Sequence, residues 1–204
     1  MDNGIGSNGV GRSSEVPLRA TALATTLHTL VGAKVSIDID EPRARFSLRL
    51  RVSASAAAAL ASPASMLLPM PINSCTVAGS RVVARLGPDE WLVSCREASA
   101  EQTAADFTHA LKATIFSLTD VGHRNVSFLV HGERAREVIN GGCPLDLGDA
   151  RFPPGSATRT VFGKAEIVLM RTGPALSYQV ECWRSFAPYV YALLRHGVRE
   201  FTVS

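Results

Sequence analysis

The alternation of hydrophobic and polar residues is densest between Thr158 and Leu194. Within this segment, an apolar and β-branched run predicts a strand from Val161 to Met170, and Gly173-Pro174 predicts a turn. Residues Tyr178–Trp183 then alternate between apolar and polar, which predicts a second strand. We therefore expect two strands joined by a tight turn.

The same segment ends in a predicted amphipathic helix. Ser185 stands where an N-cap would stand, and Pro188 falls in the first turn, where its missing N–H costs little. Apolar residues follow at helical spacing: Phe186, Tyr189, Val190, Leu193 and Leu194. The complete unit is strand, turn, strand and capped helix.

Upstream of this unit the pattern predicts shorter elements. In chain order they are a helix at 18–30 ended by Gly32, strands at 35–39 and 46–52, a helix at 56–61, strands at 82–86 and 90–95, and a helix at 102–115 with Ala105, Phe107, Ala110, Leu111 and Ile115 inward. In strand 46–52, apolar residues alternate with the basic set Arg45, Arg49 and Arg51. We expect a half-buried strand whose basic outer face meets solvent, an acidic partner or, with less support because stacking aromatics are missing, RNA.

After residue 115 the order of elements starts again. Strands are predicted at 116–121 and 125–130, and a helix at 133–139. Leu50 then matches Leu129 in the second series. The sequence predicts an α+β fold of two pseudo-repeated strand–helix–strand–strand–helix halves, intertwined around one sheet or two packed sheets.

The predicted domain boundaries follow from this repeat and from composition. Residues 1–16 are rich in Gly, Ser and Asn, which predicts a disordered leader. Residues 17–204 form a single α+β domain, with halves at about 17–115 and 116–204.

Composition and charge exclude several classes of protein. The 204 residues are 46% hydrophobic and 19% charged, which is typical of a globular chain, and a net charge of +3 is too small to indicate nucleic acid. No apolar run reaches the ~20 residues of a membrane span, and the N-terminus lacks the apolar core of a secretory signal. We predict a cytoplasmic protein with neither a membrane nor a nucleic-acid partner, and with four reduced, mostly buried cysteines.

Motifs for catalysis or cofactor binding do not emerge from the sequence. The five histidines lack metal-site spacing, and the G-x-G pairs near the N-terminus follow no strand. Cys143 is either an activated thiol or a small buried residue at a corner, and burial is the commoner case. We predict no catalytic, cofactor-binding or metal-binding residue in this chain.

A surface for a protein partner is the remaining candidate site. Arginine and aromatic residues outside obvious core positions are enriched at protein interfaces. The residues that suit such a surface are Arg159, Trp183, Arg184, Phe186 and Tyr189.

Five short motifs follow one another along the chain: Gly87–Leu92 (GPDEWL), Asp120–Arg124 (DVGHR), Gly142–Leu147 (GCPLDL), Thr158–Lys164 (TRTVFGK) and Glu181–Ala187 (ECWRSFA). In this order they resemble the gamma subunit family of heterotetrameric sarcosine oxidase. The resemblance extends from about Pro17 to His196 and implies a fold similar to the folate-binding domain of the glycine-cleavage aminomethyltransferase.

The resemblance also implies a place in an oxidoreductase complex. That complex oxidatively demethylates sarcosine to glycine, with hydrogen peroxide and a one-carbon unit that passes to tetrahydrofolate. Its alpha, beta and delta subunits are expected to hold FAD, FMN, NAD, zinc and tetrahydrofolate, and the gamma subunit none of these. A structural role follows for this chain, and a stand-alone folate-binding aminomethyltransferase-like protein is the alternative.

Overall fold

The computed structural model describes residues 30–32, 34–51, 68 and 71–201. Eleven strands form one sheet in the order β1-β2-β8-β11-β10-β9-β4-β5-β6-β3-β7. The strands are β1 (Leu30–Gly32), β2 (Val35–Ile39), β3 (Arg43–Leu50), β4 (Ser74–Ala78), β5 (Arg81–Arg85), β6 (Glu90–Arg96), β7 (Phe116–Asp120), β8 (Asn125–His131), β9 (Ser156–Phe162), β10 (Ala165–Arg171) and β11 (Ser177–Trp183). The described helices are α2 (Ala100–Ala110), α3 (Ala135–Asn140) and α4 (Ala187–Arg199), and the 3₁₀ turns η1 (Glu97–Ser99) and η2 (Arg184–Phe186) lead into α2 and α4.

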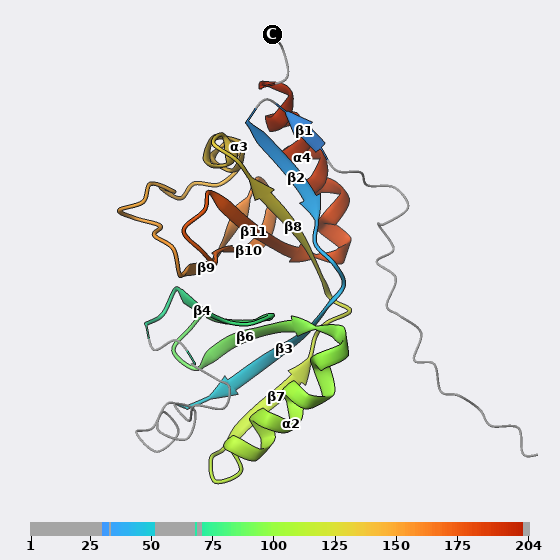
Figure 1. The fold of residues 1–204 in the computed structure, drawn as a ribbon, viewed down its shortest axis with the longest axis vertical. Coiled ribbons are helices and arrows are strands. Elements are labelled where there is room, and N and C mark those ends of the chain that lie inside the picture. Colours follow the sequence, from blue (N-terminus) through green and yellow to red (C-terminus); the bar gives the residue numbers. More distant parts are fainter. Residues whose placement is uncertain (1–29, 33, 52–67, 69–70, 202–204) are drawn as a thin grey trace, which may run out of the picture.

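The sheet has two halves, and a single strand pairing, that of β4 with β9, links them. β4 and β9 are antiparallel neighbours that pair through a single residue couple, Ser74 with Ser156. On one side of this couple lie β4, β5, β6, β3 and β7, which form the lower half in Figure 1. On the other side lie β9, β10, β11, β8, β2 and β1, which form the upper half.

Two strands cross from one half to the other. β2 precedes β3 in the chain but pairs with β8 of the second half, with Ile37 opposite Val130. β7 precedes β8 but pairs with β3 of the first half, with Leu48 opposite Leu118. Each half therefore contains a strand from the other part of the chain, so the halves are intertwined.

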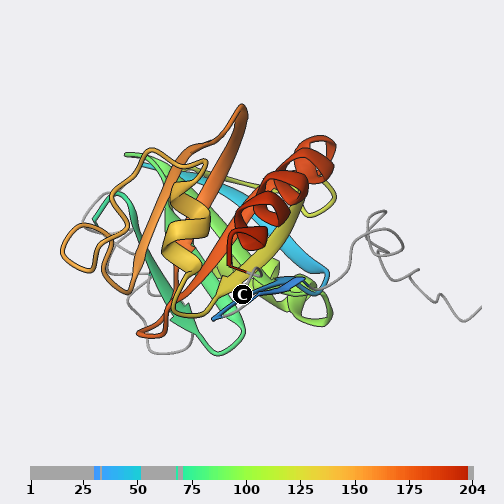
Figure 2. The same ribbon diagram turned by 90° about the horizontal axis from the view of Figure 1, so that it is seen from above.

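Three groups of buried side chains stabilise this arrangement through the burial of apolar surface. The first lies between the first half and α2, and includes Trp91 and Phe107. The second lies between the second half and the helices α3 and α4, which run over it in Figure 2, and includes Phe128. The third group joins the two halves, with Leu92 and Val168 among its members. The helices thus cover the outer faces, while the inner faces of the sheet meet each other.

The predicted strand from Val161 to Met170 is wrong, because this segment is a hairpin. β9 ends at Phe162 and β10 begins at Ala165. Gly163 has a φ of +59°, a left-handed conformation that glycine adopts without steric cost, and the chain reverses there. The turn was not predicted because apolar residues stand on both sides of it and resemble one continuous strand.

The helix predicted at 102–115 is shorter than expected. α2 ends at Ala110, and Ile115, which was predicted to face inward, is 94% exposed. Ala105 is exposed as well, whereas Thr103 and Phe107 form the buried face of the helix. The predicted face was therefore only partly right, because a threonine takes one of its buried positions.

The start of α4 also differs from the prediction. Ser185 is not its N-cap, because it lies inside η2 and the helix begins at Ala187. Pro188 occupies the first turn, as predicted. Leu30 and Gly32 belong to β1, so they do not end a helix as expected.

The remaining predictions are mostly confirmed. Strands at 35–39, 82–86, 90–95, 116–121, 125–130 and 178–183 match the structure to within one residue at each end. The α+β class is confirmed as well, since helices pack on the sheet, whose strands pair antiparallel. The leader at 1–16, the helix at 56–61 and most of the helix at 18–30 lie outside the described residues. In the part of the chain that the structure describes, no helix is long and apolar enough to cross a membrane.

Candidate functional site

The inner faces of β3 and β11 point polar side chains toward each other. Ala44, Phe46 and Leu48 of β3 belong to the core beneath α2. Because side chains alternate along a strand, Arg45 points the opposite way, to the second half. Val180 of β11 belongs to the other helix-covered core, so the next residue, Glu181, points to the first half. The two side chains meet as an ion pair, with 2.8 Å between Arg45 Nε and Glu181 Oε2.

Arg45 contradicts the predicted basic outer face of β3. It is 3% exposed and Glu181 is 1% exposed, because the second half covers this side of the strand. Arg49 does lie at the surface, but its Nη1 is 3.2 Å from Asp89 Oδ1. The basic strand face on which the RNA alternative rested is therefore not a continuous surface.

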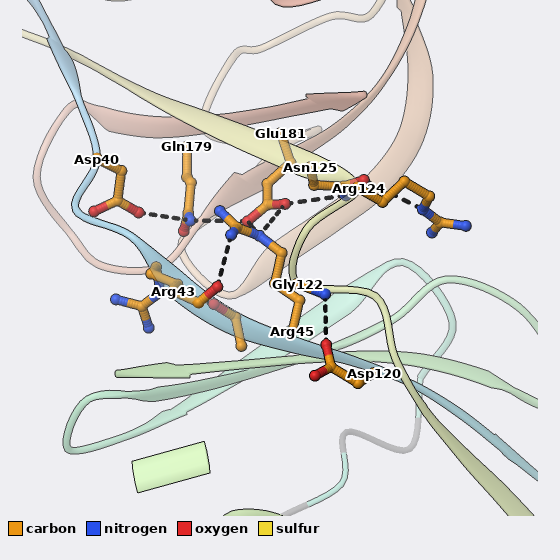
Figure 3. A network of polar contacts seen from close by, with 10 residues as sticks. Asp40, Arg43, Arg45, Asp120, Gly122, Arg124, Asn125, Gln179 and Glu181 are labelled. Atoms are coloured by element: carbon orange, nitrogen blue, oxygen red, sulfur yellow. Dashed lines mark hydrogen bonds and ion pairs between the residues drawn. The ribbon is translucent and has the colours of Figure 1, made fainter. Parts of the chain in front are cut away.

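Glu181 is fully engaged by side chains of this chain (Figure 3). Arg45 Nε donates to both carboxylate oxygens, at 2.9 Å and 2.8 Å. Asn125 Nδ2 donates to Oε2 at 3.2 Å, and Gln179 Nε2 donates to Oε1 at 3.3 Å. Each oxygen thus accepts two hydrogen bonds, which offset much of the cost of burying the charge.

Asp40 extends the network toward the strand that crosses between the halves. It follows β2, and its Oδ2 accepts a hydrogen bond from Gln179 Nε2 at 3.2 Å. Burial raises the pKa of Asp40; Arg43 opposes this effect, and the negative charge of Glu181 adds to it. The folded protein therefore holds a proton on Asp40 more tightly than the unfolded chain does.

Replacement Asp40→Asn is expected to stabilise the protein at pH 7 more than at pH 4. With a folded-state pKa above the ordinary value of 3.8, ionised Asp40 lowers stability as the pH rises through that range. The asparagine removes the charge, and its amide oxygen still accepts from Gln179. Urea denaturation of both proteins at the two pH values measures the difference. A larger gain at pH 4 than at pH 7 would contradict the assigned direction.

A shallow hollow opens beside the ion pair, between the two halves. Its lining includes Glu90, Arg124, Asn125, Arg159, Glu181 and Trp183. The space between its walls, counted out to open solvent, is about 410 Å³. The centres of water molecules can occupy only about 30 Å³ of that space. That space suits a few water molecules better than a ring-containing ligand.

A second ion pair joins the halves at this hollow. Arg159 of β9 donates to Glu90 of β6 through Nη2 at 2.7 Å and Nη1 at 3.2 Å. This hydrogen bonding lowers the pKa of Glu90, and the charge of Arg49 acts in the same direction. Arg159 and Glu90 thus form a charge-compensated pair across the boundary between the halves.

The cysteines are free and buried, as predicted. Burial raises the pKa of Cys75 to about 11 and that of Cys182 to about 12, so both thiols stay protonated at neutral pH. Cys143 is 4% exposed and follows the short helix α3, which supports the buried-corner alternative. Among the described residues, no group of three histidine, cysteine or acidic side chains could hold a metal ion.

The structure brings four of the five predicted interface residues together. Trp183, Arg184, Phe186 and Tyr189 are exposed and follow one another from the end of β11 into the first turn of α4. Arg159 lies on β9, where it lines the same hollow as Trp183 but is paired with Glu90.

The sequence reasoning missed Arg124 as a member of this region. Its guanidinium lies 5.8 Å from the centroid of the Trp183 ring, in the range of a cation–π contact. It also missed the pair Arg45 and Glu181. The available signal was one charged residue in each of two strands whose neighbouring residues are apolar.

Comparison with known families decides the relationship of this chain. The profile of the family described as "Sarcosine oxidase, gamma subunit family" matches residues 51–200. The chain belongs to the sarcosine oxidase gamma subunit family. The resemblance inferred from the five motifs is therefore confirmed, and the role of the chain is that of a gamma subunit. No curated protein sequence matches it.

Solved structures of low sequence identity share the fold of this gamma subunit. A chain of heterotetrameric sarcosine oxidase from Corynebacterium sp. U-96, in complex with pyrrole 2-carboxylate, has 24% identity and a TM-score of 0.78, with 89% of this chain and 94% of that chain covered. Glycine cleavage system aminomethyltransferase T from Bartonella henselae has 10% identity and a TM-score of 0.60 over 80% of this chain. The gamma subunit spans about half of that transferase, 46% of its chain.

Proposed function

We propose that this gamma subunit is a non-catalytic, structural component of a cytoplasmic heterotetrameric sarcosine oxidase. In this proposal the alpha, beta and delta subunits hold FAD, FMN, NAD, zinc and tetrahydrofolate and convert sarcosine to glycine, hydrogen peroxide and a one-carbon unit on the folate. The family match over residues 51–200 is the observation that supports membership in the complex.

The hydrogen bonding and burial of the Glu181 carboxylate support a structural role. Glu181 accepts two hydrogen bonds on each oxygen, all from groups of its own chain. A general base needs a lone pair directed at substrate, and a nucleophile needs an accessible atom. Both requirements fail for a carboxylate that is 1% exposed and fully engaged.

Activity of the assembled complex tests the non-catalytic role. The gamma subunit is co-expressed with alpha, beta and delta subunits of sarcosine oxidase, and the purified complex is assayed for hydrogen peroxide release from sarcosine. The variant Arg45→Met/Glu181→Gln removes both buried charges and keeps an acceptor for Asn125. We expect kcat per assembled complex to stay within about twofold of the wild type. A loss of a hundredfold or more in kcat, with assembly intact, would overturn the proposal.

The alternative function, a stand-alone folate-binding aminomethyltransferase-like protein, rests on the likeness to aminomethyltransferase T. The hollow between the halves, with about 30 Å³ open to the centre of a water molecule, argues against a pterin site there. Titration of the purified chain with tetrahydrofolate separates the two functions. Micromolar binding by the isolated chain would favour the alternative.

We also propose that the two halves are copies of one unit, as the sequence suggested. Strand pairing supports this, since β3 pairs with β6, β6 with β5 and β5 with β4, just as β8 pairs with β11, β11 with β10 and β10 with β9. A 3₁₀ turn and a long helix follow β6 and β11 alike. The pairing places Arg43 opposite Arg96 and Asn125 opposite Trp183, so Arg43 corresponds to Asn125. The match of Leu50 with Leu129 inferred from the sequence is therefore three residues out of register.

A further inference from the structure

The two halves can be compared at the ends of β6 and β11, the strands that correspond to each other. β6 ends at Arg96, enters the turn η1 and continues as α2, while β11 ends at Trp183, enters η2 and continues as α4. The backbone at the two strand ends is nearly the same. Arg96 has φ −60° and ψ 145°, and Trp183 has φ −64° and ψ 142°.

The side chains on these matching backbones differ in kind. The first corner carries Arg96, Glu97 and Ser99. The second corner carries Trp183, Arg184 and Phe186 at the same three positions, with Trp183 46% and Phe186 40% exposed. An arginine and a serine satisfy this local structure in the first half, so the fold does not require exposed aromatic rings there. Exposed aromatic clusters that the fold does not need mark interaction sites.

Unpaired positive charge accompanies the aromatic rings. Arg124 lies over the Trp183 ring at 5.8 Å, and the backbone N–H of Arg184 donates to the Arg124 carbonyl oxygen at 2.8 Å. Among the described residues, neither guanidinium has a carboxylate within ion-pair distance. Arg159, by contrast, is neutralised by Glu90. Arg124 Nε does donate to the neutral amide oxygen of Asn125, at 3.4 Å. The region therefore combines two exposed rings with two guanidinium groups whose charge no carboxylate of the described residues neutralises.

We propose that this aromatic-basic corner, defined as Arg124, Trp183, Arg184 and Phe186, docks an acidic segment of a partner subunit. The inference rests on the proposed function, because it takes the partner from the same complex. Guanidinium groups bind carboxylates in a bidentate, charge-assisted geometry, and tryptophan and arginine dominate the binding energy of protein interfaces. The corner thus selects a segment with Asp or Glu side chains beside an apolar residue. Tyr189 is a marginal contributor, since its hydroxyl already accepts the backbone N–H of Lys164 at 3.0 Å.

The test replaces the second corner with the residues of the first. In the variant Trp183→Arg/Arg184→Glu/Phe186→Ser, each new side chain is one that the matching backbone already carries, so the fold should be preserved. The control is Ile115→Ser, which removes an exposed apolar residue far from the corner in sequence and in the other half. Tagged wild-type and variant chains are co-expressed with the alpha, beta and delta subunits to follow assembly. The Kd of each purified gamma subunit for the complex of the other three subunits is then measured at low and high salt.

We expect the corner variant to weaken association by roughly thirtyfold or more, the control to match the wild type, and wild-type binding to weaken as salt rises. A photocrosslinking phenylalanine analogue at position 186 should label an Asp- or Glu-containing segment of a partner subunit. If the variant binds as tightly as the wild type, the corner is not the docking site, while the proposed function stands. If the wild type itself fails to associate, the proposed function fails first. Crosslinks to a second copy of this chain, or to a segment without acidic residues, would also overturn the inference.

Discussion

Replacement Glu181→Ala is expected to lower the free energy of unfolding by about 3–5 kcal/mol. The substitution leaves the guanidinium of Arg45 3% exposed and without its counter-ion. It also removes the acceptor of the Asn125 amide, whose Nδ2 then lies buried without that partner, and leaves Gln179 with Asp40 alone as an acceptor. Urea denaturation of the full-length chain, followed by circular dichroism, measures the loss.

A double variant shows whether the loss comes from the uncompensated charge. Arg45→Met/Glu181→Gln removes both charges and retains an amide oxygen for Asn125, so it should recover most of the stability lost in Glu181→Ala. Buried ion pairs are often replaceable by neutral side chains of similar size, whereas loss of a single partner is costly. If Glu181→Ala costs less than about 1 kcal/mol, the pair does not hold the halves together and water must reach Arg45.

The sequence predicted the period of β3 correctly and the environment of its polar face wrongly. Alternation of apolar with basic residues indicates a strand with one face in the core, and Phe46 and Leu48 confirm that face. The same alternation is silent about what covers the other side. In this fold the second half covers it, and the compensating charge, Glu181, is supplied by a strand more than a hundred residues away in the chain.

The sequence predicted intertwined halves but not which strands are exchanged, and this gap has the same non-local origin. The exchange of β2 and β7 between the halves depends on pairings such as Ile37 with Val130, which leave no mark in local periodicity. Local signals did better: Gly173-Pro174 does lie where the chain reverses between β10 and β11, although in a five-residue loop rather than a tight turn. The exposed Trp183 and Phe186 were also recognised from residue type and position. Arg124 was missed as part of that corner because a connecting segment brings it over Trp183.

Replacement Gly132→Ala is expected to cost about 3 kcal/mol, because it combines backbone strain with a steric clash. Gly132 has a φ of +118°, which side chains with a Cβ rarely adopt. A Cβ there would lie 2.3 Å from the carbonyl oxygen of Lys34 and 3.0 Å from Val35 Cα. Both contacts are backbone at the start of β2, so they cannot rotate away. The alanine would push the exchanged strand off β8.

Gly79→Ala is the matched control for this prediction. Gly79 has a φ of +60°, and a Cβ there would meet nothing within 4 Å, so this variant pays the conformational cost of about 1 kcal/mol alone. Both variants are compared by urea denaturation, and amide hydrogen exchange follows the β2 residues. We expect exchange at Ile37, which faces Val130, to accelerate more in Gly132→Ala than in Gly79→Ala. Equal losses of stability in the two variants would show that the approach of β2 to Gly132 is looser than the structure indicates, and that β2 contributes little to holding the second half.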